Sequence, residues 1–317
     1  MNNEENPKSQ TPKSQMTKYE IRITEYASRI THHTSLMTGK PTFSQNFSAA
    51  VAETRLRLIN ISRYPGQLAM EIIIPIIFAS MPMLLGRATA GDNASANFAA
   101  NTGTTNYVAF LLIGSNVFTL VSNAFWHIAN WLRFEQETGT LESIYLTPTP
   151  SIVIASGVAF YSIMRGLISA SLAYFIGCLI FQVNPLQGDV LLALLFIFFG
   201  LLPLYGMAML FGALVLKVKE SNALINLMQW VVSFLMGIFY PVAVLPPLVR
   251  FVAYLFPPTW MINGVRSSLL GVGFFFGQWY LDMAVLWAFM LAAPLFGYWV
   301  FTRVESNVKR NEGMGEF

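Results

Sequence analysis

Two ionisable side chains, Glu71 and Arg165, lie inside long apolar stretches of the sequence. Arg165 belongs to the apolar run 151–181, and Glu71 stands near the start of the run 68–86. Burying a charge in such a run is costly, so its presence hints at function by default. The plainer alternative is that Arg165 extends to the membrane surface or pairs with a carboxylate. Residues of opposite charge can attract each other, so Glu71 and Arg165 are a candidate intramembrane ion pair.

Other candidate sets for catalysis or cofactor binding are missing from the sequence. It contains no acidic pair, no Ser/His/Asp set and no His/Cys cluster at metal-ligand spacing. Gly39-Lys40 is followed by proline and lacks the upstream glycine of a phosphate-binding loop. The adjacent His32 and His33 would point in different directions on a helix, and Cys178 has no cysteine partner. We therefore expect neither enzymatic activity nor a metal or cofactor in this chain.

The most concentrated polar chemistry lies in the stretch 134–148. Five positions recur at spacings of three and four, as on one side of a helix: Trp131, just before the stretch, and Phe134, Thr138, Leu141 and Tyr145 within it. The opposite side is polar, and Pro148 and Pro150 would end the helix. The pattern predicts a short amphipathic helix across the mouth of two membrane helices, where a contact from outside the membrane could push it. The alternative is an ordinary interfacial loop.

The composition determines the class of protein that must position these residues. Hydrophobic residues make up 55% of the 317 residues, charged residues only 11%, and the mean hydropathy is +0.53. Soluble domains are about one quarter charged, so these values indicate a multi-spanning membrane protein. The net charge of +3 is too small to indicate nucleic-acid binding.

The apolar runs predict an all-α membrane protein with six spanning helices. A helix needs about 20 apolar residues to cross a bilayer. Runs of that kind cover residues 68–86, 107–129, 151–181, 190–216, 221–240 and 278–301. Gly91-Asp92-Asn93 and Asn184-Pro185 mark turns between them.

Between the last two runs, residues 241–277 are apolar but rich in proline. The prolines are Pro241, Pro246, Pro247, Pro257 and Pro258. A proline inside a helix costs about 3 kcal/mol, so one continuous span is disfavoured. Two short helices that enter the membrane and return on the same side fit better, provided that they are buried against protein.

The ends of the chain differ in character from the spans. Residues 1–45 are polar, without a secretory signal, and we expect a flexible cytoplasmic tail. Residues 46–63 combine an apolar stripe with three arginines, which predicts a helix lying flat among the lipid headgroups. The alternative is a soluble helix that packs on another subunit. Residues 46–303 would form the transmembrane domain, and residues 304–317 a charged cytoplasmic tail.

The distribution of positive charge predicts the orientation. Of the 19 Lys and Arg residues, 15 lie before span one, between spans two and three, between spans four and five, or after span six. Positively charged loops stay on the cytoplasmic side. Both termini and the stretch 134–148 are therefore expected in the cytoplasm.

Three segments resemble the type-2 exporter permeases of ATP-binding-cassette (ABC) transporters. The segment Glu137-Thr-Gly-Thr-Leu-Glu142, followed by Thr147-Pro148, is similar to their cytoplasmic coupling segment, which touches a separate ATPase subunit. The segment from Tyr240-Pro241 through Phe256-Pro257-Pro258-Thr259 to Gly271 is similar to their re-entrant helix pair. Residues 46–63 match their connecting helix. Together the resemblance covers about residues 46–303.

The resemblance implies roles for two sets of residues. The set for coupling to the ATPase is Arg133, Glu135, Glu137, Thr138, Gly139, Thr140, Leu141, Glu142, Thr147 and Pro148. The set for the re-entrant motif is Pro241, Pro246, Pro247, Pro257, Pro258, Thr259 and Arg266.

The resemblance also implies partners and a location. ATP and Mg would bind the ATPase subunit, and a second permease copy or a homologous permease would complete the transporter in a prokaryotic cell membrane. The substrate would be amphipathic, lipidic, drug-like or a glycan. The alternatives are an ATP-independent secondary transporter, which favours inverted repeats and mid-span charges, and an intramembrane enzyme.

Overall fold

The computed structural model describes residues 43–63, 65–138, 149–215 and 221–311. Within these ranges the regular structure is helical, with α-helices and two short 3-10 turns and no strand. The all-helical prediction therefore holds for the described part of the chain. The coupling residues from Gly139 to Pro148 and most of the predicted N-terminal tail lie outside it.

Five of the described helices are long and apolar enough to cross a membrane. They belong to α3 (Pro65–Ala90), α5 (Tyr107–Glu137), α7 (Ser151–Phe181), α8 (Val190–Val215) and α12 (Trp279–Asn311). The remaining predicted span, 221–240, corresponds to α9 (Ser221–Met236), which is apolar but shorter. The helix ends there because Gly237 turns the backbone to a φ of 63°, which glycine adopts without strain.

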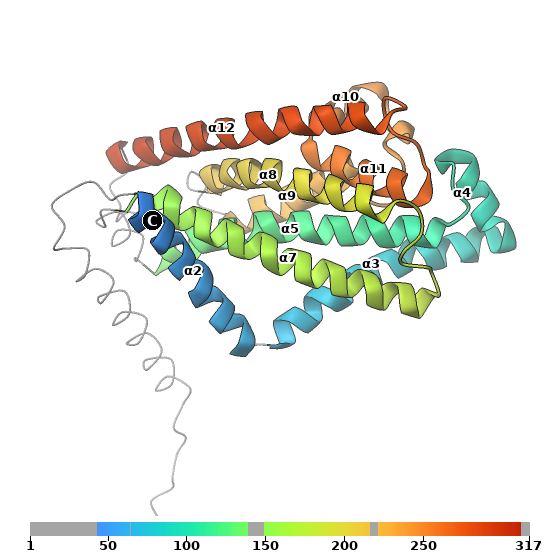
Figure 1. The fold of residues 1–317 in the computed structure, drawn as a ribbon, viewed down its shortest axis with the longest axis horizontal. Coiled ribbons are helices and arrows are strands. Elements are labelled where there is room, and N and C mark those ends of the chain that lie inside the picture. The colour runs from blue at the N-terminus through green and yellow to red at the C-terminus, as the bar shows by residue number, and fades with distance from the viewer. Residues whose placement is uncertain (1–42, 64, 139–148, 216–220, 312–317) are drawn as a thin grey trace, which may run out of the picture.

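The long helices run roughly side by side, with α5 in the middle of the bundle (Figure 1). α8 packs on α12 and α5, and α5 packs on α3 and α7. At one end of the bundle lie α4 (Ala94–Thr102), α10 (Pro247–Tyr254) and α11 (Pro257–Leu270), as Figure 1 shows. At the other end lie the end of α5, the start of α7 and the end of α12.

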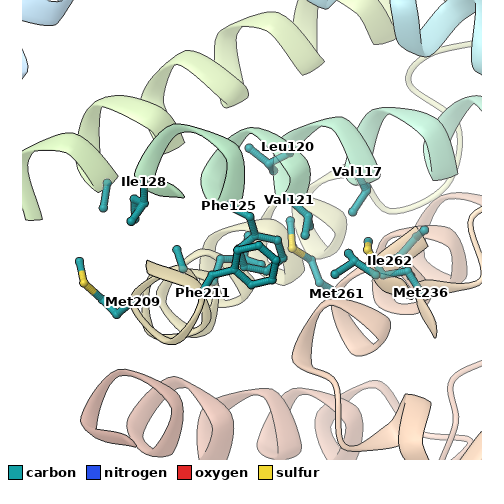
Figure 2. Packing of buried hydrophobic residues seen from close by; sticks show 14 of the residues in the cluster. Val117, Leu120, Val121, Phe125, Ile128, Met209, Phe211, Met236, Met261 and Ile262 are labelled. Atoms are coloured by element: carbon teal, nitrogen blue, oxygen red, sulfur yellow. The ribbon is translucent and has the colours of Figure 1, made fainter. Parts of the chain in front are cut away.

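The main cluster of buried apolar side chains in the described chain draws on α5, α7, α8, α9, α11 and α12. Figure 2 shows Val121 and Phe125 of α5 facing side chains from α8 and α11. The rings of Phe125 and Phe211 stack with their centroids 5.4 Å apart. Inside a bilayer such contacts stabilise by close packing, because lipid tails are as apolar as the side chains.

Small residues let the helix backbones approach closely. A Cβ atom added at Gly206 of α8 would overlap the backbone of Ala293 in α12, and one added at Gly297 would overlap the backbone of Gly206. This is the role that small residues have in membrane helix packing. The contact between α8 and α12 therefore depends on glycine at both positions.

The helix predicted over the stretch 134–148 does not begin as a separate helix. Residues 131–137 continue α5 without a break. Trp131 Nε1 donates a hydrogen bond to Glu135 Oε1 at 3.0 Å, a contact between residues four apart on one helix face. The apolar run ends at Ala129, but the helix does not, because polar residues continue a helix as well as apolar ones do.

Two further segments are helical outside the predicted spans. The region 87–106 contains the helix α4, which follows the 3-10 turn Gly91–Asn93. Its short, alanine-rich sequence lacks the apolar periodicity that identifies helices. The last helix continues past Arg303 to Asn311, so part of the predicted C-terminal tail is helical.

Candidate functional site

The end of α5 holds the described part of the predicted coupling set. Glu135 accepts the hydrogen bond from the buried Trp131, and Arg133 is half-buried. Thr138 closes the helix, since its backbone N–H and its Oγ1 both donate to Phe134 O, at 3.0 and 2.7 Å. Glu137 is the last helical residue. The described chain resumes at Thr149, just before α7 begins at Ser151.

The neighbouring helix ends are tied together at this end of the bundle. Ser151 Oγ, the first residue of α7, donates a hydrogen bond to Glu305 Oε1 of α12. Glu305 is buried although it carries a carboxyl group. The start of α7 is thus fixed on α12, directly after the segment for which the resemblance implies a contact with an ATPase.

Helix α2 (Phe43–Arg63) lies against α7 of the same chain. Thr54 Oγ1 donates to Gly157 O at 3.1 Å, and also to Ala50 O at 2.9 Å. A Cβ atom at Gly157 would stand 2.6 Å from Ala50 O, so the two backbones are in close contact. Phe47 and Val51 remain exposed, which leaves apolar surface on α2 for lipid or another subunit.

Arg165 and Glu71 form an ion pair between α7 and α3. Arg165 Nη2 lies 2.7 Å from Glu71 Oε1, and Nε donates to Oε2 at 3.1 Å. Arg165 Nη1 donates to Tyr161 Oη at 2.9 Å, and Nη2 to Gln67 Oε1 at 3.5 Å. The side chains are 7% and 16% exposed. Two-point contact of this kind is the strong form of an Arg–carboxylate pair.

The prolines of the predicted re-entrant motif begin short helices. Pro247 and Pro257 are the first residues of α10 and α11, where the missing N–H costs nothing and the fixed φ suits the helix. Pro246 precedes α10, and Pro241 precedes the 3-10 turn Val242–Val244. Pro258 and Thr259 are buried, and Thr259 Oγ1 donates to Leu235 O at 3.3 Å.

The buried Arg266 side chain of α11 forms hydrogen bonds with the start of α5 and with the residues that follow α9. Its Nη1 donates to Gly237 O at 2.8 Å, its Nη2 to Ile238 O, and its Nε to Phe110 O at 3.3 Å. The guanidinium also lies 3.5 Å from the centre of the Phe110 ring. Room for it exists because residue 114 is glycine, where a Cβ atom would overlap the guanidinium. Arg266 therefore fixes α11 to the end of α9 and the start of α5.

Asp282, which the sequence pattern did not single out, is fully buried in the first turn of α12. Its carboxylate accepts the backbone N–H groups of Phe275 and Phe276, at 2.8 and 3.0 Å. These bonds hold the loop between α11 and α12 in place. The available signal was a lone acidic residue at the start of an apolar run, the position where a carboxylate satisfies free N–H groups.

The residues of the predicted coupling set and re-entrant motif that the structure describes thus lie in two groups. Arg133, Glu135 and Thr138 lie at one end of α5, whereas Thr259, Arg266 and the prolines gather at the other end of the bundle. The pair of Glu71 and Arg165 belongs to neither group.

Comparison with known proteins supplies the family. The model of the family "ABC-2 type transporter" matches residues 49–270, which is more than half of the chain. The inner membrane transport permease YadH of Escherichia coli (strain K12) is 25% identical over 168 residues, and so is its counterpart in Shigella flexneri. The aligned part is 53% of this chain and 64% of each relative, less than two thirds of their length. The chain is an integral membrane protein that belongs to the ABC-2 type transporter family.

Proposed function

We propose that this chain is the membrane-spanning permease subunit of an ATP-driven exporter. A separate ATPase subunit would bind ATP and Mg and hydrolyse the nucleotide. A second copy of the chain, or a homologous permease, would complete the pathway. Family membership supports this proposal, as does the name of the relatives, inner membrane transport permease.

The observation that carries the proposal is the continuity of α5. This helix is the most buried of the five candidate spans, and it contacts α3, α7, α8, α9 and α11. It then runs on to Glu137, the first residue of the segment that resembles a coupling segment. A push from an ATPase at that end would reach the core through one unbroken helix rather than through a flexible joint.

The other end of the bundle would face outward. The positive-inside charge distribution supports cytoplasmic termini in a prokaryotic cytoplasmic membrane, with six spans if α9 is counted. In that orientation α10 and α11 would enter and leave the membrane from the outside. The buried contacts of Arg266 and Thr259 support this arrangement, because irregular backbone is tolerated at membrane depth where it is buried in protein.

The substrate class that we propose is amphipathic: a lipid, a drug-like molecule or a lipid-linked glycan. Large apolar side chains along α3 and α9 are exposed, among them Ile77, Met81, Trp230 and Phe234. A surface of this kind suits a pathway for apolar molecules or the contact with the second permease. The competing function, ATP-independent secondary transport, would use charged mid-span residues, and here the pair of Arg165 and Glu71 neutralises itself.

Copurification tests the proposed function. The chain is expressed with its neighbouring genes, purified in a mild detergent, and the bound proteins are identified by mass spectrometry. We expect an ATPase with a phosphate-binding loop at a fixed ratio to this chain, and substrate export from vesicles that requires ATP hydrolysis. Transport driven by an ion gradient without any ATPase would contradict the proposal.

A further inference from the structure

A cleft of about 430 Å³ lies where α3, α4 and the start of α5 meet the residues that follow α9. Ligand pockets in proteins have volumes of about 300–1,000 Å³, so the space suits a small molecule. The cleft belongs to the end of the bundle that holds α4, opposite the end of α5 where the described coupling residues lie (Figure 1). In the proposed orientation it would face the outside of the cell.

Helix α4 turns a face with two amide side chains toward the cleft. Four of the lining residues recur at helical spacing along it: Ala94, Asn97, Phe98 and Asn101. Asn101 Nδ2 donates to Asn97 O at 3.2 Å, which leaves its Oδ1 available. The side-chain amide of Asn97 makes no hydrogen bond within the described part of the chain, and both asparagines are exposed. The two amides thus offer both donors and acceptors to an occupant.

Aromatic rings form another part of the wall. The Phe98 ring is held by two neighbours, with its centroid 6.0 Å from that of Tyr107 and 5.1 Å from that of Phe110. Tyr240 is held by its hydroxyl, which donates to Phe234 O at 2.7 Å. Phe98, Tyr107 and Tyr240 line the cleft. Rings that are already fixed offer their faces to a ligand without a large cost in conformational entropy.

The chemistry of the wall selects the class of ligand. None of the described residues that line the cleft has an ionised side chain, so a phosphate or an ammonium group would find no opposite charge there. A purely apolar molecule would cover the amides of Asn97 and Asn101 without hydrogen-bonding them, which is costly. A sugar ring suits both parts of the wall. Its hydroxyl groups pair with amides, and its C–H face lies well on the negative face of an aromatic ring.

We propose that this cleft binds one pyranose ring of an uncharged glycan. Asn97 and Asn101 hydrogen-bond with its hydroxyl groups, and the aromatic rings contact its C–H face. The inference rests on the proposed export function and narrows the substrate class to a glycan, whose sugar would pass this site on the outer side.

Photolabelling of the purified full chain in lipid nanodiscs tests the proposal. The probes are methyl glucoside, galactoside and mannoside, each with a photoreactive diazirine, and purification avoids maltoside detergents because they would compete. We expect at least one probe to label the chain near Thr89 and Tyr240, which line the cleft from α3 and from the segment after α9. The unmodified methyl glycoside should displace this probe, and cyclohexanol at the same concentration should not. Displacement by cyclohexanol, or no labelling by any probe, would overturn the proposal.

Two variants with matched controls complete the experiment. Asn97→Ala removes one amide and should weaken displacement by the glycoside about fivefold, the value of a neutral hydrogen bond. Asn93→Ala, at an exposed position that does not line the cleft, should leave it unchanged. Gly86→Phe places a ring in the cleft, since nothing lies within 4 Å of an added Cβ atom there, and should abolish labelling. Ala88→Phe, at an exposed position of α3 outside the lining, should not. Persistent labelling in Gly86→Phe, or unweakened displacement in Asn97→Ala, would overturn the proposal.

Failure of the sugar site and failure of the proposed function give different results. Glycoside binding in nanodiscs needs no ATP, whereas the proposed function is tested by the copurifying ATPase. An ATPase bound to a chain that no glycoside labels would overturn the sugar site alone. Labelling of a chain that has no ATPase would support the sugar site and contradict ATP-driven export.

Discussion

Arg165 of α7 and Glu71 of α3 face each other with two contacts between guanidinium and carboxylate, at 2.7 and 3.1 Å. Tyr161 and Gln67 accept further hydrogen bonds from the same guanidinium. The pair joins the first candidate span to the third, across residues that are far apart in the chain. The charge of Arg165 is thereby satisfied inside the protein, as in a structural pair.

Separating this pair should destabilise the protein more than removing it. Glu71→Ala leaves a buried, unpaired arginine and is expected to cost about 3 kcal/mol of unfolding free energy. The double variant with Arg165→Met removes both charges and should recover most of that loss. The measurement is unfolding in mixed detergent micelles as a double-mutant cycle. Strictly additive effects of the two substitutions would show that the residues do not interact.

Replacing Arg266 should loosen the contact between α11 and the end of α9. Arg266→Met removes the donors to Gly237 O, Ile238 O and Phe110 O. An unsatisfied buried carbonyl costs about 1–3 kcal/mol, so the loss of unfolding free energy should exceed about 2 kcal/mol. The control is Arg87→Met at the exposed end of α3, with an expected effect within about 0.5 kcal/mol. Similar stability of both variants would contradict the role given to Arg266.

A methyl group at residue 114 should cause part of the loss of unfolding free energy that is expected for Arg266→Met. In Gly114→Ala the new Cβ would overlap the guanidinium of Arg266 and Ile238 O, so both must move. Overpacking of this kind costs about 1–3 kcal/mol. Gly86→Ala is the matched control, because nothing lies within 4 Å of the added atom there. Thermal unfolding in detergent should rank Gly114→Ala clearly below the control, and equal melting temperatures would refute the packing argument.

Cysteine labelling tests which end of the bundle faces the cytoplasm. In a Cys178→Ala background, single cysteines replace Thr138 at the end of α5 and Asn93 before α4, both exposed. An impermeant thiol reagent should reach position 93 from outside intact cells and position 138 only after the membrane is opened. Labelling of both positions from the same side would contradict the topology.

The sequence predicted the helical class and most of the long helices, because runs of about 20 apolar residues are a strong signal. It also singled out Glu71 as a candidate partner of Arg165, since buried charges need opposite charges. It could not predict that α5 continues past Ala129 or that Ala94–Thr102 is helical, because neither segment is apolar and periodic. Asp282 escaped notice for another reason: its role depends on the backbone N–H groups of Phe275 and Phe276, which come close to it only in the fold.

The proposed coupling role of the segment after α5 can be tested at Glu142. A carboxylate at a contact with the ATPase would pair with Arg or Lys, and leaving that partner unpaired costs about 2–5 kcal/mol. Glu142→Lys adds repulsion and should abolish both ATPase binding and export, while Glu142→Gln, which keeps the shape and one acceptor, should do less. Asp92→Lys, at the opposite end of the bundle, is the control for reversed charge.

The deciding measurement is copurification of the ATPase with these three variants at equal membrane levels, together with ATP-dependent export. We expect Glu142→Lys to reach the membrane folded but without its ATPase, and Asp92→Lys to keep the ATPase bound. If Glu142→Lys retains its ATPase and exports like the wild type, the segment after α5 does not couple the two subunits.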